Sequence, residues 1–101
     1  MTGPVLFSQS VTDFLKAFGS EKRQEIFLSI FTDGKEHNIT EVAERAGIAQ
    51  STASEHLSNL KRAGVLLSRK VEKEVFYHLD RQGITARIDE IRSLLNCCQE
   101  E

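Results

Sequence analysis

The sequence predicts a mainly α-helical protein with one small β-hairpin. Three observations indicate this fold class. Apolar residues recur at helical spacing in five stretches, the spacing changes from 3.6 to 2 after Gly64, and the turn Gly47-Ile48-Ala49 separates two of the helical stretches. Two helices joined by so short a turn form a helix-turn-helix, and a following hairpin forms a wing. Since 101 residues suit one domain, we expect a single winged helix-turn-helix domain over 1–101.

Two helices are expected before the helix-turn-helix. The first is predicted over about 10–18, where Ser10 or Thr12 could cap its start. Its apolar stripe, at i, i+3, i+4 and i+7, consists of Val11, Phe14, Leu15 and Phe18. The second is predicted to begin near Ser20 and to stop at Asp33-Gly34.

The helix-turn-helix is predicted over about 40–63, with Thr40 as the N-cap of its first helix. The longer helix, about 50–63, has an apolar side and a polar side. The apolar side holds Ala53, Leu57 and Leu60. The polar side holds Ser51, Thr52, Glu55, His56, Asn59 and Arg62.

The wing is predicted over about 66–79, with strands at 66–71 and 74–79 joined by Glu72-Lys73. A last helix is predicted over about 84–98. Its apolar seam consists of Ile84, Ile88, Ile91, Leu95 and Cys98.

The charge of the chain is unevenly distributed. The net charge of −2 alone does not indicate a nucleic-acid partner. Residues 45–73, however, hold six basic and two acidic residues, a net +4, which leaves seven basic and thirteen acidic residues, a net −6, elsewhere. Such asymmetry suggests nucleic-acid contact, although a charge run can equally be a solvated face.

The start of the longer helix carries short polar side chains, as a recognition helix does where it meets base edges in the major groove. Gln50 could make a bidentate contact to adenine, and the helix N-terminus favours phosphate. Ser51 could instead be an ordinary N-cap, and Glu55 would repel phosphates. The candidate DNA contacts in this helix are Gln50, Ser51, Thr52, Ser54, His56 and Asn59.

The run "QSTASEHLSNLKRAGVL" followed by "FYHL" resembles the ArsR/SmtB family of winged-helix repressors. The resemblance spans most of the chain. It implies a homodimer joined through the first and last helices, binding of double-stranded operator DNA through the recognition helix and the wing, and release by an inducer. It adds three wing residues as DNA contacts, namely Arg69, Lys70 and Lys73.

The resemblance also places the dimer interface on the two apolar stripes, which a core this small need not use fully. The implied interface residues are Val11, Phe14, Leu15, Phe18, Ile84, Ile88, Ile91 and Leu95. Packing within the chain's own core is the alternative role of these residues.

The family's usual metal sites are missing from this sequence. The helix "ITEVAERA" contains no cysteine, and the last helix offers Asp89 and Glu90 without a histidine. Cys97 and Cys98 remain as a candidate site for trivalent arsenic or another soft metal acting as inducer. The alternatives are packing, an intermolecular disulfide, a thiol redox switch, or no inducer at all. A helix C-terminus beside two glutamates disfavours the thiolates that a redox switch needs.

Other functions receive less support from the sequence. No paired carboxylates, phosphate-binding glycine loop or Cys–His arrangement indicates an enzyme, and no required cofactor is expected. No long apolar run indicates a membrane span and no basic, apolar leader is visible, so we expect a cytoplasmic protein without a membrane partner. A winged-helix protein-interaction module remains the alternative to a DNA-binding repressor.

Overall fold

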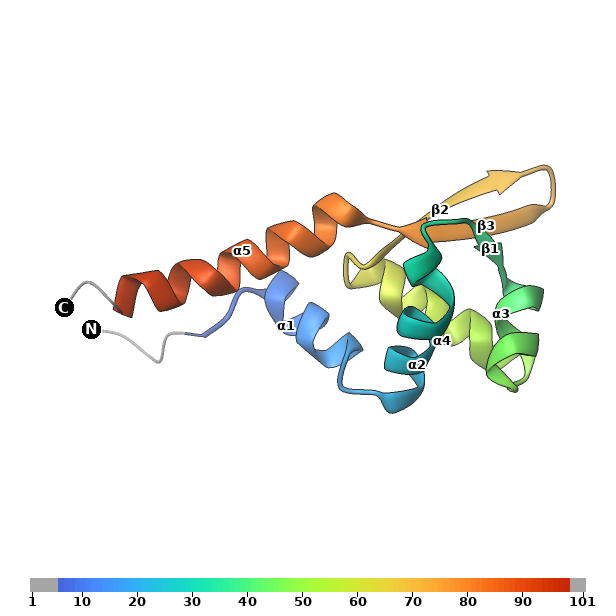
Figure 1. Ribbon diagram of the computed structural model, residues 1–101, viewed down its shortest axis with the longest axis horizontal. Helices are drawn as coiled ribbons and strands as arrows, with labels where there is room; N and C mark the ends of the chain where they lie inside the picture. The colour runs from blue at the N-terminus through green and yellow to red at the C-terminus, as the bar shows by residue number, and fades with distance from the viewer. Residues whose placement is uncertain (1–5, 99–101) are drawn as a thin grey trace.

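The computed structural model of the protein describes the backbone of residues 6–98 and the side chains of residues 6–96. It has the predicted winged helix-turn-helix architecture, with helices on both sides of the helix-turn-helix and the wing (Figure 1). The elements in chain order are α1 (Gln9–Ala17), α2 (Glu21–Ile30), the 3-10 helix η1 (Phe31–Asp33), β1 (His37–Asn38), α3 (Ile39–Ala46), α4 (Gln50–Arg62), β2 (Leu66–Val71), β3 (Glu74–Leu79) and α5 (Arg81–Cys98).

Side-chain caps fix where the first helices begin. Ser8 caps α1, because its backbone is extended and its hydroxyl accepts a hydrogen bond from the amide of Val11 at 3.2 Å. Ser10 and Thr12 lie inside the helix, so the expected cap was wrong. The helix α2 begins next to Ser20, as predicted, and Ser20 caps it, with its hydroxyl 3.2 Å from the backbone amide of Arg23.

The helix-turn-helix consists of α3 and α4. Asn38, rather than Thr40, caps α3, and its amide oxygen lies 2.8 Å from the Glu41 amide nitrogen. Gly47 ends α3 in the left-handed conformation, with φ 69°. The cap position of α4 is Ala49, which offers no side-chain acceptor, so Ser51 is not the N-cap of this helix.

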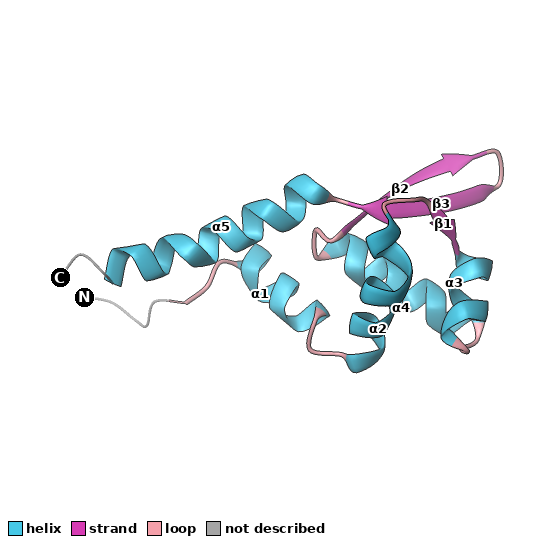
Figure 2. Ribbon diagram, viewed as in Figure 1, coloured by secondary structure: helices cyan, strands magenta, loops and turns pink. Residues whose placement is uncertain are grey.

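The hairpin has the predicted strand boundaries, but the sheet has a third strand that the sequence did not predict. The strand order is β1-β3-β2, and both pairings are antiparallel. Helices cover one face of this sheet (Figure 2). The inner face holds Leu66 and Tyr77, which are buried, and the outer face holds Leu67, which is exposed. The hairpin turn places Glu72 at φ 57°, a left-handed conformation that is rare for a residue with a side chain.

The short strand β1 is held by a buried histidine. His37 is 4% exposed, and its ring lies edge-on against Phe31. Its Nδ1 lies 2.8 Å from Glu41 Oε2 and its Nε2 lies 2.9 Å from Asp33 Oδ2. Because carboxylates only accept, the ring donates to both only when it is doubly protonated. The backbone amide of Lys35, and then His37, lower the pKa of Asp33.

The last helix begins at Arg81, three residues before the predicted start. The carboxylate of Asp80 accepts a hydrogen bond from the amide of Gly83 at 2.8 Å and so caps the helix. Gly83 lies directly against the carbonyl of Gly64, where no Cβ would fit. From there α5 runs past α1 and away from the rest of the chain, giving extents of 51 × 23 × 22 Å (Figure 1). Over the described part of the chain, no helix has the length and apolarity to cross a membrane.

One hydrophobic core joins α1 to α4 and the inner face of the sheet. Its largest fully buried side chains are Phe31, Ile26, Ile30, Leu57, Leu60, Leu66, Val11, Val42 and Val65. The rings of Phe14, Phe18 and Phe27 follow one another edge to face, with centroids 5.3 and 5.2 Å apart. The core thus fixes α4 against α1 and α2 along one side only.

Candidate nucleic-acid interface

The side of α4 opposite the core is open to solvent. Ala53, Leu57 and Leu60 are fully buried. We call the stripe on the opposite side the reading face; it consists of Ser51, Glu55, Ser58 and Arg62, all exposed at helical spacing. A helix that presents a continuous polar stripe beside a wing can lie in a DNA major groove.

The structure distributes the candidate residues of α4 around this face. Ser51 lies on the reading face, whereas Thr52, Ser54 and Asn59 are half-buried on its flanks. Ser58 was not predicted from the sequence, although its spacing of four and three residues from Ser54 and Glu55 would have found it. The Gln50 amide nitrogen lies 3.3 Å from the Thr40 hydroxyl, which turns Gln50 toward α3.

His56 faces α2 rather than solvent. The Arg23 guanidinium donates to His56 Nδ1 at 3.3 Å. Burial is the largest cause that lowers the pKa of His56, followed by the charge of Arg23, while Glu55 opposes the shift. The ring is therefore neutral and accepts a hydrogen bond from α2, which differs from the expectation of a free DNA contact.

Arg69 is also engaged within the chain. Its Nε and Nη2 lie 2.6 and 2.8 Å from the two carboxylate oxygens of Glu36, on the outer face of the sheet. This bidentate hydrogen bonding lowers the pKa of Glu36 and raises that of Arg69. His78 Nδ1 lies 3.8 Å from the same carboxylate. Arg69 is thus not the free wing cation that the sequence suggested, and we leave it out of the proposed DNA contacts.

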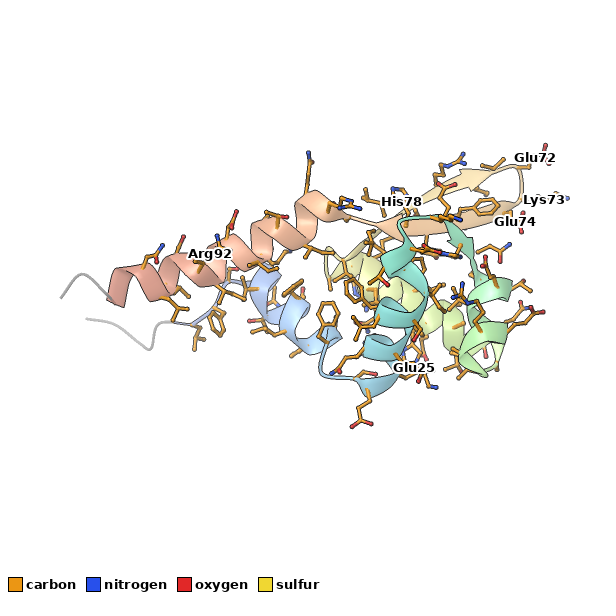
Figure 3. The ribbon with its side chains drawn as sticks, in the orientation of Figure 1. Glu25, Glu72, Lys73, Glu74, His78 and Arg92 are labelled. Carbon is orange, nitrogen blue, oxygen red and sulfur yellow. The ribbon has the colours of Figure 1, made fainter. Side chains whose placement is uncertain are left out.

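The other two wing cations are exposed. Lys70 lies opposite Val75, on the sheet face that Arg69 does not share. Lys73 lies at the hairpin tip between Glu72 and Glu74 (Figure 3). The carboxylate of Glu74 accepts a hydrogen bond from the side-chain amide Nδ2 of Asn38 at 2.7 Å.

The wing tip and the start of α4 meet around one cavity of about 210 Å³. Its lining residues are Asn38, Ile39, Thr40, Gln50, Lys73, Glu74 and Val75. The structure therefore brings Gln50 and Lys73, predicted from separate segments, to one side of α4.

The residues predicted for the dimer interface divide between the core and the surface. Val11 and Phe14 are buried in the chain's own core, and Phe18 and Ile84 pack against it. Ile91 is half-buried. Leu15, Ile88 and Leu95 are 44%, 43% and 63% exposed. Packing within the chain's own core therefore accounts for some of these residues, and the dimer interface stays a prediction for the exposed ones.

The candidate inducer site cannot be described in the same way. Cys97 and Cys98 end α5, and their side chains lie outside the described residues. Within the described part of the chain, no group of three or more His, Cys, Asp or Glu residues could hold a metal ion. The thiol site stays a prediction.

The core-backed helix-turn-helix, the open reading face and the wing define a winged helix-turn-helix domain. A family model described as a helix-turn-helix domain matches residues 18–69. The transcriptional activator HlyU of Vibrio cholerae is 32% identical over 80 residues, which cover 79% of this chain and 72% of that protein. The chain belongs to the ArsR/SmtB family of winged helix-turn-helix transcriptional regulators.

Solved structures agree with this assignment. Reduced HlyU from Vibrio cholerae N16961 is 30% identical, with a TM-score of 0.62 over 84% of this chain and 87% of that chain. A possible transcriptional regulator for arsenical resistance is 26% identical, with a TM-score of 0.66 over 88% and 86%. The homodimeric winged helix-turn-helix DNA-binding domain of Mb0332 from Mycobacterium bovis, at 21% identity, shares the fold, with a TM-score of 0.67 over 100% and 94%.

Proposed function

We propose that the protein is a homodimeric, sequence-specific DNA-binding repressor that acts in the cytoplasm and leaves its operator when an inducer binds. The observation that carries the proposal is the reading face, an exposed polar stripe on a helix whose other side is fixed in the core. Two of its four side chains, Ser51 and Ser58, present hydroxyl groups, which allow close approach to bases and phosphates. Repression then follows from occupancy of the operator.

The proposed contacts fall into two classes. Gln50, Ser51 and Thr52, near the start of α4, read base edges, with Ser54 and Asn59 on the flanks of the helix. Lys70 and Lys73 on the wing neutralise phosphates and act on every sequence alike. Glu55 lies in the middle of the reading face, where its carboxylate can accept from the amino group of a cytosine or an adenine.

The homodimer rests on the exposed apolar side chains of α1 and α5. Leu15 on α1 and Ile88, Leu94 and Leu95 on α5 are each between 43% and 63% exposed, and α5 extends away from the rest of the chain (Figure 1). Burying the exposed half of such a side chain against a second copy releases roughly 1–2 kcal/mol for each. The Mycobacterium bovis domain with the same fold is described as homodimeric, which supports this arrangement.

The proposed inducer is trivalent arsenic or another soft metal, bound by Cys97 and Cys98. Support comes from the paired thiols and from the 26%-identical structure described as a possible regulator for arsenical resistance. Thiol oxidation is the second candidate, because the HlyU relative was solved in a form described as reduced. In either case the two cysteines respond, so the same variant tests both.

Selection from a random duplex library tests DNA recognition. The expected result is enrichment of one motif, bound with an affinity that falls steeply with salt. Gln50→Ala should relax the preference at one position, whereas Lys70→Gln and Lys73→Gln should weaken binding to all sequences. No enrichment together with no salt-dependent binding would identify a protein-interaction module instead.

Release from the selected duplex tests the inducer. Wild-type protein is titrated with arsenite, cadmium, zinc and peroxide, each monitored by fluorescence anisotropy of the DNA. Release by arsenite or cadmium supports metal sensing, and release by peroxide alone supports a redox switch. A response that survives in the Cys97→Ser, Cys98→Ser double variant excludes both thiol mechanisms.

A further inference from the structure

A polar groove runs along one side of α4, where this helix meets α1 and α2. It consists of two adjoining cavities of about 260 and 240 Å³ that share Arg23, Asn59 and Arg62. The first is also lined by Asp13, Lys16 and Ala63, and the second by Glu55, His56 and Ser58. We call it the α1–α4 groove.

One cation in this groove is held rigidly. The Nε of Arg23 donates to the carbonyl of Ala17 at 2.9 Å, and Nη2 donates to the carbonyl of Lys16 at 3.4 Å. Its Nη1 donates to His56. Since these acceptors are neutral, they orient the guanidinium without cancelling its charge. A fixed cation loses less conformational freedom when an anion binds than a free one does.

The rest of the groove favours an oxyanion. Lys16 and Arg62 are exposed, and neither forms an ion pair within the described part of the chain. Together with Arg23 and the Asn59 amide they supply mainly hydrogen-bond donors. Two carboxylates line the groove as well. Asp13 already accepts from the Gln9 amide at 2.8 Å, and Glu55 borders only the second cavity.

The position of the groove identifies the source of the oxyanion. Gln50 faces the wing, and Asn59 faces the groove. Nine residues of helix separate them, which places the two at about 180° around the axis of α4. Arg62 belongs to both the reading face and the groove. A duplex lying on the reading face therefore has the wing along one edge and this groove along the other.

We propose that the α1–α4 groove binds a backbone phosphate of the DNA, on the side of α4 opposite the wing, through Lys16, Arg23 and Arg62. The inference rests on the proposed DNA-binding function and extends the interface to α1 and α2. Lys16 and Arg62 donate to the phosphate from the rim, and Arg23 donates from the floor of the groove.

The test is the salt dependence of binding to the selected duplex, measured by fluorescence anisotropy. In the Lys16→Gln, Arg62→Gln double variant we expect the slope of log affinity against log salt to fall by about 0.9, as one phosphate contact is lost. The loss in affinity between 50 and 200 mM salt should then be about threefold smaller than for wild type. Lys61→Gln is the control for Arg62→Gln, because each removes one positive charge from α4 and only Arg62 lines the groove. It should leave the slope unchanged.

Each other outcome has a definite meaning. An unchanged slope in the double variant, alongside a reduced slope for Lys70→Gln, overturns the groove as a DNA contact and keeps the proposed function. A second measurement tests whether the groove binds a free anion instead, by adding inorganic phosphate at constant ionic strength. If phosphate raises the unfolding midpoint of wild type but not of the double variant, and the salt slope of the double variant is unchanged, the groove binds free phosphate. That result also overturns the groove as a DNA contact. Wild-type protein without salt-dependent binding overturns both. The urea midpoints of the variants confirm that they fold.

Discussion

Replacing Gly83 by alanine should destabilise the protein, although helix propensity alone predicts the opposite. Gly83 is buried in the first turn of α5, and alanine in a helix interior is favoured over glycine by about 0.5–1 kcal/mol. A Cβ at this position, however, would meet the Gly64 carbonyl and the Asp80 carboxylate well inside van der Waals contact. One of these is backbone, so the strain cannot be relieved by a side-chain rotation.

The expected magnitude follows from these opposing effects. Overpacking of this kind costs about 1–3 kcal/mol. Displacing the Asp80 carboxylate also weakens the cap of α5, which contributes about 1 kcal/mol. After subtracting the gain in propensity, we expect the free energy of unfolding to fall by about 1–3.5 kcal/mol, and the Tm to fall by about 4–8 °C for each kcal/mol.

Urea unfolding followed by circular dichroism measures this change, at one fixed protein concentration because a dimer's stability depends on it. Gln82→Ala is the matched control, since Gln82 is exposed in the same turn and should change stability by less than about 0.5 kcal/mol. If Gly83→Ala is as stable as wild type, the close packing of α5 on Gly64 is wrong, and helix propensity determines the effect of the substitution.

Three further predictions concern the core, pH and assembly. His37→Phe should lower the free energy of unfolding by about 2 kcal/mol, because the hydrogen bonding of the buried ring to Asp33 and Glu41 is lost; a urea midpoint within error of wild type would contradict this. Burial and the charge of Arg23 lower the pKa of His56 in the folded state below its unfolded value of 6.5. The contribution of the neutral ring to the free energy of unfolding is therefore complete above pH 6.5 and is lost as the pH falls through the folded-state pKa. His56→Gln should therefore lose less stability than wild type between pH 7.5 and 5, and an equal loss would refute the shift. Leu95→Glu should weaken dimerisation at least about 100-fold in sedimentation experiments, whereas Ser93→Glu, on the other side of α5, should not.

Periodicity predicted the elements that are long enough to show it. The stripe beginning at Val11, the apolar side of α4 and the alternation in the hairpin each repeat several times, and each element was found. The strand β1 has two residues, too few for any period, and depends on pairing with β3. The N-caps of α1 and α3 were placed at least two residues too late, because several hydroxyl or amide residues compete for each cap. The start of α5 was misplaced because its apolar seam begins only at Ile84, whereas the helix begins at Arg81, where Asp80 caps it and Gly83 allows close contact with Gly64.

The sequence predicted those parts of the candidate interface whose charged and polar residues are close together in the chain. The basic segment 45–73 includes Arg69, whose charge is balanced by Glu36 from outside that segment. It does not include Lys16 and Arg23, which folding brings to the side of α4. A partner that is distant in sequence cannot be read from local composition, so the pattern identified the reading helix but not its full electrostatic surroundings.

Arg23 links the helix proposed for dimerisation, α1, to the helix proposed for DNA binding, α4. Its guanidinium touches the final carbonyls of α1, which lies beside α5, and the ring of His56 on α4. A rotation of α1 relative to α4 must lengthen one of these contacts. If dimerisation changes the affinity for DNA through this link, then binding of DNA must change the affinity between the subunits by the same free energy. Dimer dissociation measured with and without duplex, in wild type and in Arg23→Gln, would therefore report how much of this coupling depends on the arginine.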